Sequence, residues 1–349
     1  MVNIDMIYLK VPDQKFLNLF SRRNKLNAIV LFSLIVLVVI LSLSRGSVDL
    51  SRGQIIEAFL RKGDMTNQII FWELRLPRLI ASLLVGSALG MSGALLQGML
   101  RNGLASPYLL GISAGSGLVI VLLISMGLWL SWIPIAAWIG AIVTTFIVYS
   151  LAKSNGSISV ERLILGGVAL SSLFGSIQSM LLLQTEDGRV QSALTWLIGS
   201  LNSRGWSEIK LAGPPILLAL IMSLLLSRQL NLLGLGDELS VGLGNSLFRS
   251  RCLIGASATL LAASSVSVGG LIGFVGLIVP HAVRFLFGTD YRLVLPFSAL
   301  LGALTLSTAD LIARSGSIEF PVGIITSLLG APIFIVLLYQ RQRLLTNRR

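Results

Sequence analysis

Apolar residues occur along most of the chain in long runs that short polar segments separate. A membrane-spanning helix needs roughly 20 mostly apolar residues to cross about 30 Å of hydrocarbon. Ten runs approach that length, at residues 27–44, 79–99, 108–127, 132–152, 163–184, 211–227, 252–269, 271–287, 294–313 and 321–339. The seventh and eighth runs nearly touch. The pattern predicts an all-α integral membrane protein of about ten transmembrane helices.

Composition supports one compact membrane domain. Of the 349 residues, 54% are hydrophobic and 12% are charged, whereas soluble domains carry about 25% charged residues. Ten helices would use roughly 200 residues, which leaves only short connections. We therefore predict a single transmembrane domain over residues 27–340, preceded by segment 1–26 and followed by tail 341–349. The 35 glycines suit helices whose backbones approach closely in lipid.

The distribution of cations predicts the orientation. Lysine and arginine gather in segment 1–26, in tail 341–349 and in alternate loops, while most acidic residues lie in the other loops. Cytoplasmic loops carry the excess of Lys and Arg, so both termini are expected inside. The net charge of +12 then reflects an anionic membrane surface rather than nucleic acid. No small-residue cleavage pattern follows run 27–44, so we interpret it as a retained helix.

Three loops exceed the usual length. The outer segment 45–78 contains an amphipathic stretch at 51–60 that would lie on the surface, and the outer segment 185–210 contains tryptophans typical of interfacial anchors. The inner loop 228–251 contains an amphipathic stretch at 234–244 bracketed by glycines. This inner loop predicts two short helices joined by a tight turn and exposed to a cytoplasmic partner.

Residue content excludes several chemistries. With one cysteine, Cys252, and one histidine, His281, the chain has neither an intrachain disulfide nor a Cys/His metal cluster. The phosphate-binding pattern Gly-x-x-x-x-Gly-Lys-Ser/Thr is absent from the sequence. We therefore expect no bound cofactor, and any ATP hydrolysis that drives transport belongs to a separate subunit.

Two short patterns resemble intramembrane protease motifs. Gly90-Met-Ser92-Gly93 resembles a serine-nucleophile motif with His281 as its base, and Gly234-Leu-Gly-Asp237 resembles an aspartyl motif with Asp310 as its partner. An aspartate pair must share a proton at close range inside the membrane, but Asp237 falls in a polar loop. The simpler interpretation of the first pattern is close helix packing.

An ion-coupled carrier is the other transport alternative. It would need ionisable side chains in the middle of the membrane. The only acidic residue within the ten predicted spans is Asp310, near a helix end, while His281 and Arg284 lie close to the inner boundary. This scarcity argues against ion coupling.

Several longer stretches converge on one family. They are Glu73-Leu-Arg-Leu-Pro-Arg78, Val85 to Gly98, Arg101-Asn-Gly-Leu-Ala-Ser-Pro107, Leu110-Gly-Ile-Ser-Ala-Gly-Ser-Gly117, Gly273 to Arg284 and Phe320 to Pro332. Together they resemble the permease family of bacterial ABC importers for ferric siderophores, haem and vitamin B12. The resemblance implies a bundle of ten helices in each of two permease subunits, identical or paralogous. It also implies two cytoplasmic ATPase subunits and an extracytoplasmic substrate-binding protein.

The resemblance assigns roles to residues at the two membrane faces. Arg75, Arg78 and Arg314 match outward-facing arginines that bind acidic residues of the binding protein. A guanidinium is always charged and can bind a carboxylate through two hydrogen bonds. The alternative for these arginines is a local ion pair, for example with Glu73. Charge reversal of Arg75, Arg78 and Arg314 should weaken binding-protein docking with little loss of folding.

On the inner face, the resemblance assigns contact with the ATPase to the stretch from 237 to 244. The residues concerned are Asp237, Glu238, Leu239, Gly242, Leu243 and Gly244. Gly242 and Gly244 would permit the tight turn. Ser159, Val160 and Glu161 open the fifth span, which in the family borders the pathway and its inner gate, while His281 and Arg284 belong to a structural motif.

The cargo is the least determined property. The stretch Trp196-Leu-Ile-Gly-Ser-Leu-Asn202, followed by Trp206, looks more like the ferric-siderophore branch than the vitamin B12 branch. The sequence therefore favours a ferric siderophore, with vitamin B12 or haem as alternatives. A permease in the bacterial inner membrane that itself makes and breaks no bonds is the expected function.

Overall fold

The computed structural model describes residues 22–46, 50–128, 132–154, 157–316 and 318–346. Its long helices correspond one to one with the ten predicted spans, which confirms the predicted fold class. They are α1 (Arg22–Ser44), α4 (Leu76–Met99), α5 (Ile112–Ser125), α6 (Ile133–Ala152), α7 (Val160–Leu183), α9 (Trp206–Leu225), α12 (Leu247–Gly269), α13 (Val275–Phe287), α14 (Tyr291–Ala313) and α15 (Val322–Thr346). Within the described residues, seven helices are long and apolar enough to span a membrane, and 112–125, 275–287 and 322–336 are shorter apolar helices.

Two predicted spans are shorter in the structure than in the sequence prediction. The third begins with a 3-10 turn, η4 (Pro107–Leu110), and α5 starts only after Gly111, whose φ is 72°. The eighth begins at Val275 rather than 271, because Gly270 and Phe274 adopt φ values of 70° and 66° that interrupt a right-handed helix. Residues 270–274 therefore form a connection between α12 and α13 and are not part of the eighth helix.

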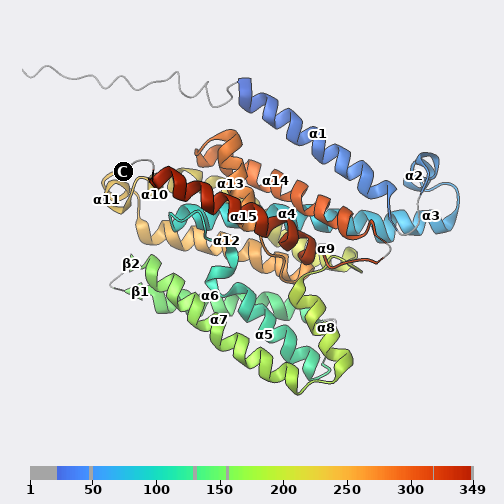
Figure 1. The fold of residues 1–349 in the computed structure, drawn as a ribbon, viewed down its shortest axis with the longest axis horizontal. Coiled ribbons are helices and arrows are strands. Elements are labelled where there is room, and N and C mark those ends of the chain that lie inside the picture. The colour runs from blue at the N-terminus through green and yellow to red at the C-terminus, as the bar shows by residue number, and fades with distance from the viewer. Residues whose placement is uncertain (1–21, 47–49, 129–131, 155–156, 317, 347–349) are drawn as a thin grey trace, which may run out of the picture.

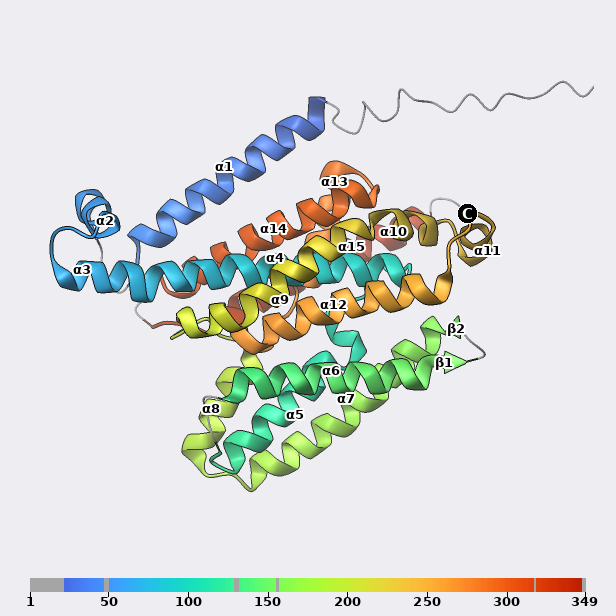
Figure 2. The same cartoon turned by 180° about the vertical axis from the view of Figure 1, so that it is seen from behind.

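Short elements lie at the two ends of the bundle. One end holds α2 (Arg52–Phe59), α3 (Met65–Ile69), the π-helical stretch η3 (Ile70–Arg75) that continues into α4, and α8 (Asp187–Ile198). The other end holds α10 (Ser227–Gly234), α11 (Asp237–Gly242) and an antiparallel hairpin of β1 (Lys153–Ser154) and β2 (Ser157–Ile158). Both views place these two groups at opposite ends of α4 (Figures 1 and 2).

The central helix is α4, which runs between α14, α12 and α13 while α5, α6 and α7 form a layer to one side (Figures 1 and 2). Its glycines allow backbone to touch backbone. A Cβ on Gly86 would lie 2.3 Å from the Gly302 carbonyl oxygen, and a Cβ on Gly93 would lie 1.7 Å from that of Gly276. Such contacts hold helices together in lipid, where the hydrophobic effect does not. The Gly90–Gly93 pattern is therefore a packing feature, as the simpler interpretation held.

Candidate functional site: two charged ends of the central helix

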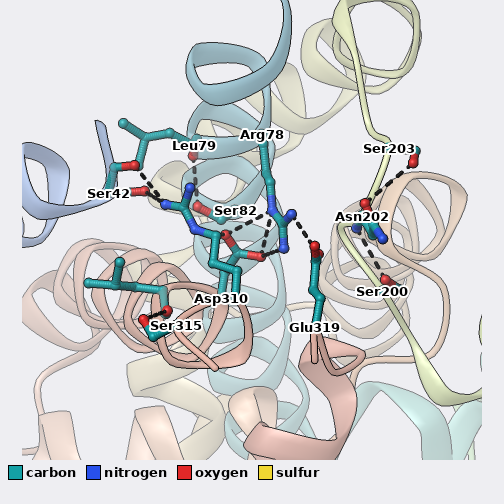
Figure 3. Close-up of polar contacts among 12 residues, drawn as sticks. Ser42, Arg78, Leu79, Ser82, Ser200, Asn202, Ser203, Asp310, Ser315 and Glu319 are labelled. Atoms are coloured by element: carbon teal, nitrogen blue, oxygen red, sulfur yellow. Dashed lines mark hydrogen bonds and ion pairs between the residues drawn. The ribbon is translucent and has the colours of Figure 1, made fainter. Parts of the chain in front are cut away.

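At the end that carries α2, α3 and α8, a buried carboxylate binds two arginines. Arg78 lies in the first turn of α4, and Asp310 lies in the last turn of α14, 1% exposed. The Arg78 Nε donates to both carboxylate oxygens of Asp310 at 3.0 and 3.1 Å, and its Nη2 donates to Oδ1 at 2.8 Å (Figure 3). The Nε of Arg314 lies 3.5 Å from Asp310 Oδ2. Asp310 is therefore a counter-charge that Arg78 and Arg314 share between α4 and the end of α14.

The remaining donors of this cluster bind the end of α1. Arg314 Nη2 donates to the Ser42 carbonyl at 2.8 Å and also contacts the Ser42 hydroxyl. Arg75 Nη1 donates to the carbonyls of Leu43 and Ser44 at 2.6 and 2.8 Å. These carbonyls belong to the last turn of a helix, where intrahelical donors are missing. Burial lowers the pKa of Arg314 below its usual value, although nearby Asp310 opposes the shift.

Glu319 completes the cluster from the loop before α15. Its Oε1 lies 2.7 Å from Arg78 Nη1, and its side chain is 34% exposed (Figure 3). The local pairing of Arg78 with Glu73 is therefore not the one observed. Both carboxylates that bind Arg78 come from far along the chain.

The three arginines expected at the surface are mostly buried. Arg75 is 5% exposed, and the side chains of Arg314 and Arg78 are 7% and 13% exposed. Their burial argues against the expectation that charge reversal would barely affect folding. A carboxylate at position 78 or 314 would face Asp310 in a buried site, and like charges there cannot both remain ionised.

The cluster forms part of the wall of a cavity of about 520 Å³. The charged residues that line this cavity are Glu73, Arg75, Arg78, Arg204, Arg314 and Glu319. A second cavity of about 500 Å³ shares Asn202, Ser203, Arg204 and Glu319 with the first. Arginines outnumber carboxylates in the first lining, so this hollow favours an acidic partner. We call the two cavities together the outer vestibule.

Arg204 is a charged residue of the vestibule that the sequence did not single out. Its guanidinium lies 4.1 Å from the centroid of the Trp196 ring, and its Nε is buried without a hydrogen-bond partner. In the described part of the chain, no salt bridge joins Arg204 to a carboxylate. Burial lowers its pKa and Glu208 raises it. A cation a few residues from Trp196 was the available sequence signal.

At the opposite end, the residues expected to meet the ATPase form α11 and the turn after it. Asp237 begins α11, and its carboxylate accepts bonds of 2.8 and 3.0 Å from Arg251 Nη2 and lies 3.3 Å from Arg101. Leu239 and Leu243 are 62% and 58% exposed. Glu238 stands beside Asp237 in the first turn. The two short helices predicted in this loop are α10 and α11, and apolar side chains of the loop are exposed on the surface of the protein.

The glycines of this loop act differently from the sequence expectation. Gly236 and Gly244 have φ values of 107° and 81°, a region that only glycine adopts readily. Gly242 is the last residue of α11 and has no such φ. The turns therefore depend on Gly236 and Gly244, not on Gly242.

The residues expected at the inner gate lie at the start of α7. Ser159 caps the helix, and its hydroxyl accepts a bond of 3.4 Å from the Arg162 backbone N–H. Val160 is half-buried and packs against the main core, while Glu161 is exposed. Arg251 links this point to the ATPase-facing loop, because its Nη1 donates to the Ile158 carbonyl at 3.0 Å.

Most of α7 is uncovered. Only Leu163 and Gly167 are fully buried along this helix, and an exposed line of Ser172, Ser176 and Ser179 runs along one face. Their spacing of four and three residues places the serines on the same side. A face that carries both apolar and small polar groups suits a boundary shared by another subunit and a wet pathway.

The two protease constellations are not assembled. Ser92 is buried, and its hydroxyl donates its single proton to the Ala258 carbonyl at 2.7 Å, so it does not donate to His281. Asp310 binds Arg78 at the start of α4 and Asp237 binds Arg101 just beyond its end. The 24 residues of α4 separate these carboxylates by about 36 Å, too far to share a proton.

Arg284 has a structural place close to the inner end. Its Nη2 donates to the Gln97 side-chain oxygen, and the Gln97 amide donates to the carbonyls of Ala105 and Leu277 at 3.2 and 3.0 Å. Gln97 thereby joins α4, the following loop and α13. His281 is exposed on α13.

Comparison with known proteins agrees with this architecture. The FecCD transport family matches residues 34–340. The cobalamin import permease BtuC of Halobacterium salinarum is 40% identical over 79% of this chain and 75% of its own, and the iron(3+)-hydroxamate permease FhuG of Bacillus subtilis is 36% identical over 88% and 95%. A solved inward-facing ABC transporter ascribed to the metal-chelate type superposes with a TM-score of 0.81 at 34% identity, over 89% of this chain and 98% of its own.

Proposed function

Because this chain belongs to the FecCD transport family and is a multi-pass permease subunit of an ABC importer, we propose that the importer carries a ferric siderophore across the cytoplasmic membrane. The observation that carries the proposal is the pair of different surfaces at the two ends of α4. One end presents a cationic vestibule, and the other presents the apolar side chains of α11. A permease that receives cargo from one partner and force from another needs both.

The proposed cargo class draws on relatives across the family. FhuG of Bacillus subtilis carries the name of an iron(3+)-hydroxamate permease, and FepG of Escherichia coli, 37% identical over 93% of this chain, that of a ferric enterobactin permease. The stretch from Trp196 to Asn202 resembles the siderophore branch. The Halobacterium relative favours cobalamin as a second candidate.

We assign ATP hydrolysis to two separate subunits that bind α10 and α11. Leu239, Val241 and Leu243 are each more than half exposed, and a short amphipathic segment of this kind suits a groove on a partner. Asp237, Arg251 and the Ile158 carbonyl form a continuous polar connection from α11 to the start of α7. ATPase closure would thus reach Ser159, Val160 and Glu161, the proposed inner gate.

A second permease subunit, identical or paralogous, would cover the exposed side of α7. The cargo would cross between the two subunits along the serine-bearing face. On the outside, a substrate-binding protein would place its carboxylates in the vestibule, near Arg75, Arg78 and Arg314. Those arginines already bind Asp310 and backbone carbonyls, so their guanidinium groups are not free. The partner would instead be attracted by their positive electrostatic field and by the donors that face the vestibule.

Reconstitution tests this function. The permease, its partner ATPase and its partner binding protein are placed in liposomes, and uptake of ferric hydroxamate, ferric catecholate, ferric citrate, haem and cobalamin is compared. Uptake of a ferric siderophore that needs both ATP and the binding protein is the expected result. Preferred uptake of cobalamin would show that cobalamin, not a ferric siderophore, is the cargo. Uptake driven by a proton or sodium gradient without ATPase would contradict the proposal.

A further inference from the structure

The two carboxylates that bind Arg78 differ in how firmly they are held. Asp310 is 1% exposed, sits on α14 and bonds both Nε and Nη2 of Arg78. Glu319 is 34% exposed, sits in the loop before α15 and contacts Nη1 alone. Removing Asp310 from its site would take away the counter-charge that Arg78 and Arg314 share, whereas Glu319 can turn into the vestibule without burying a charge.

Charge balance makes Glu319 the replaceable partner. Arg78 and Arg314 carry two positive charges and Asp310 and Glu319 carry two negative charges, so these four side chains balance, while Arg75 beside them adds one positive charge. A further carboxylate at Arg78 Nη1 would lie beside Glu319 and would be repelled by it. If Glu319 leaves as the new carboxylate arrives, the cluster keeps its balance and Arg78 keeps its geometry.

We infer that Glu319 occupies a carboxylate-binding site on Arg78 that an acidic side chain of the binding protein takes over on docking. This inference rests on the proposed function and deepens it, since it identifies the atom that receives the partner and the residue that leaves. The site opens into the first cavity of the vestibule, which Arg78 and Glu319 both line, and Glu319 also lines the second. A partner carboxylate therefore reaches Arg78 Nη1 from outside without disturbing Asp310.

Glu319 also lies close to backbone contacts between the membrane helices. Glu319 lies three residues before α15, and the next residue, Phe320, donates its backbone N–H to the Ala313 carbonyl at 3.0 Å. The first turn of α15 is joined to the end of α8, because the Gly323 N–H donates to the Gly199 carbonyl at 3.0 Å. Glu319 therefore lies next to the backbone hydrogen bonds that join the start of α15 to the ends of α14 and α8.

The chain offers a matched control for this exchange. Glu73 lines the same cavity and carries the same charge, but in the described structure no salt bridge joins it to an arginine. Glu73→Gln and Glu319→Gln therefore change the net charge of the vestibule equally. Only Glu319→Gln also removes the competitor from Arg78. Glu319→Asp keeps the charge and shortens the side chain by one methylene, so it weakens the contact alone.

The experiment measures the dissociation constant of the partner binding protein for the assembled transporter in nanodiscs. We expect Glu319→Gln to tighten binding by about two- to fivefold beyond the effect of Glu73→Gln, the range of a partly exposed ion pair. Glu319→Asp should also bind more tightly than the wild type. Equal effects of Glu73→Gln and Glu319→Gln, with wild-type binding intact, would overturn the exchange alone. Absence of binding by the wild type would overturn the proposed function and the exchange with it.

Discussion

The carboxylate of Asp310 accepts three hydrogen bonds from the guanidinium of Arg78, across 232 residues of sequence. The pair joins the last turn of α14 to the first turn of α4 and is almost shielded from solvent. Breaking a buried ion pair by removing one partner costs much more than the pair itself contributes, because the other charge remains buried.

Asp310→Asn should therefore destabilise the permease strongly. We expect a loss of about 3–5 kcal/mol, since Arg78 and Arg314 would both lose their buried counter-charge. Reversible unfolding in mixed micelles measures the change. Glu319→Gln is the control, with an expected loss of about 0–1 kcal/mol because the glutamate is partly exposed. A loss of equal size in both variants would contradict the special position of Asp310.

Close contact between α4 and α14 leads to a second prediction. A Cβ on Gly302 would lie 2.2 Å from the Gly86 carbonyl oxygen, so Gly302→Ala should force the helices apart and cost about 1–3 kcal/mol. Gly175 on α7 has no atom within 4 Å of the corresponding position. Gly175→Ala should leave the melting temperature unchanged or raise it slightly. Tolerance of Gly302→Ala would show that the two helices are less closely packed than described.

The turn after α11 should be sensitive to one glycine and not the other. Gly244→Ala puts a Cβ on a residue with φ of 81°, at a cost of about 1–2 kcal/mol, and should reduce the transport obtained per ATP hydrolysed. Gly242→Ala adds a methyl group inside a helix with open space around it and should preserve coupling. The ratio of uptake to hydrolysis in proteoliposomes distinguishes them. If both variants lose the same fraction of uptake per ATP hydrolysed, coupling depends on the exposed surface of α11 and not on the conformation of the turn.

Arg204 provides a test of docking that does not depend on the buried cluster. Its guanidinium stacks on Trp196 and lines both cavities. Arg204→Gln should weaken binding-protein affinity by about two- to fivefold and should reduce its dependence on salt. Arg189, which pairs with Glu186 at 3.4 Å, lines neither cavity, and Arg189→Gln should have little effect. If both substitutions weaken binding equally, the effect is one of overall charge.

The spans were predictable from the chain because hydrophobic length is a local property. Each run of apolar residues must become a helix in lipid, whatever its neighbours are, since its backbone groups find no water. The interruptions at Gly111 and Phe274 were not predictable, because apolar composition continues through them while backbone geometry changes.

The sequence by itself determined the apolar helices of the bundle and the connections that carry the charged and amphipathic segments. The tertiary structure alone decided which carboxylates bind Arg78. Arg78 has Glu73 close in sequence but binds Asp310 and Glu319 instead. Helix packing brings the start of α4 and the end of α14 together through glycine contacts. In a low-dielectric site, the charges that this packing buries must pair with each other, and those left at the rim remain available to partners.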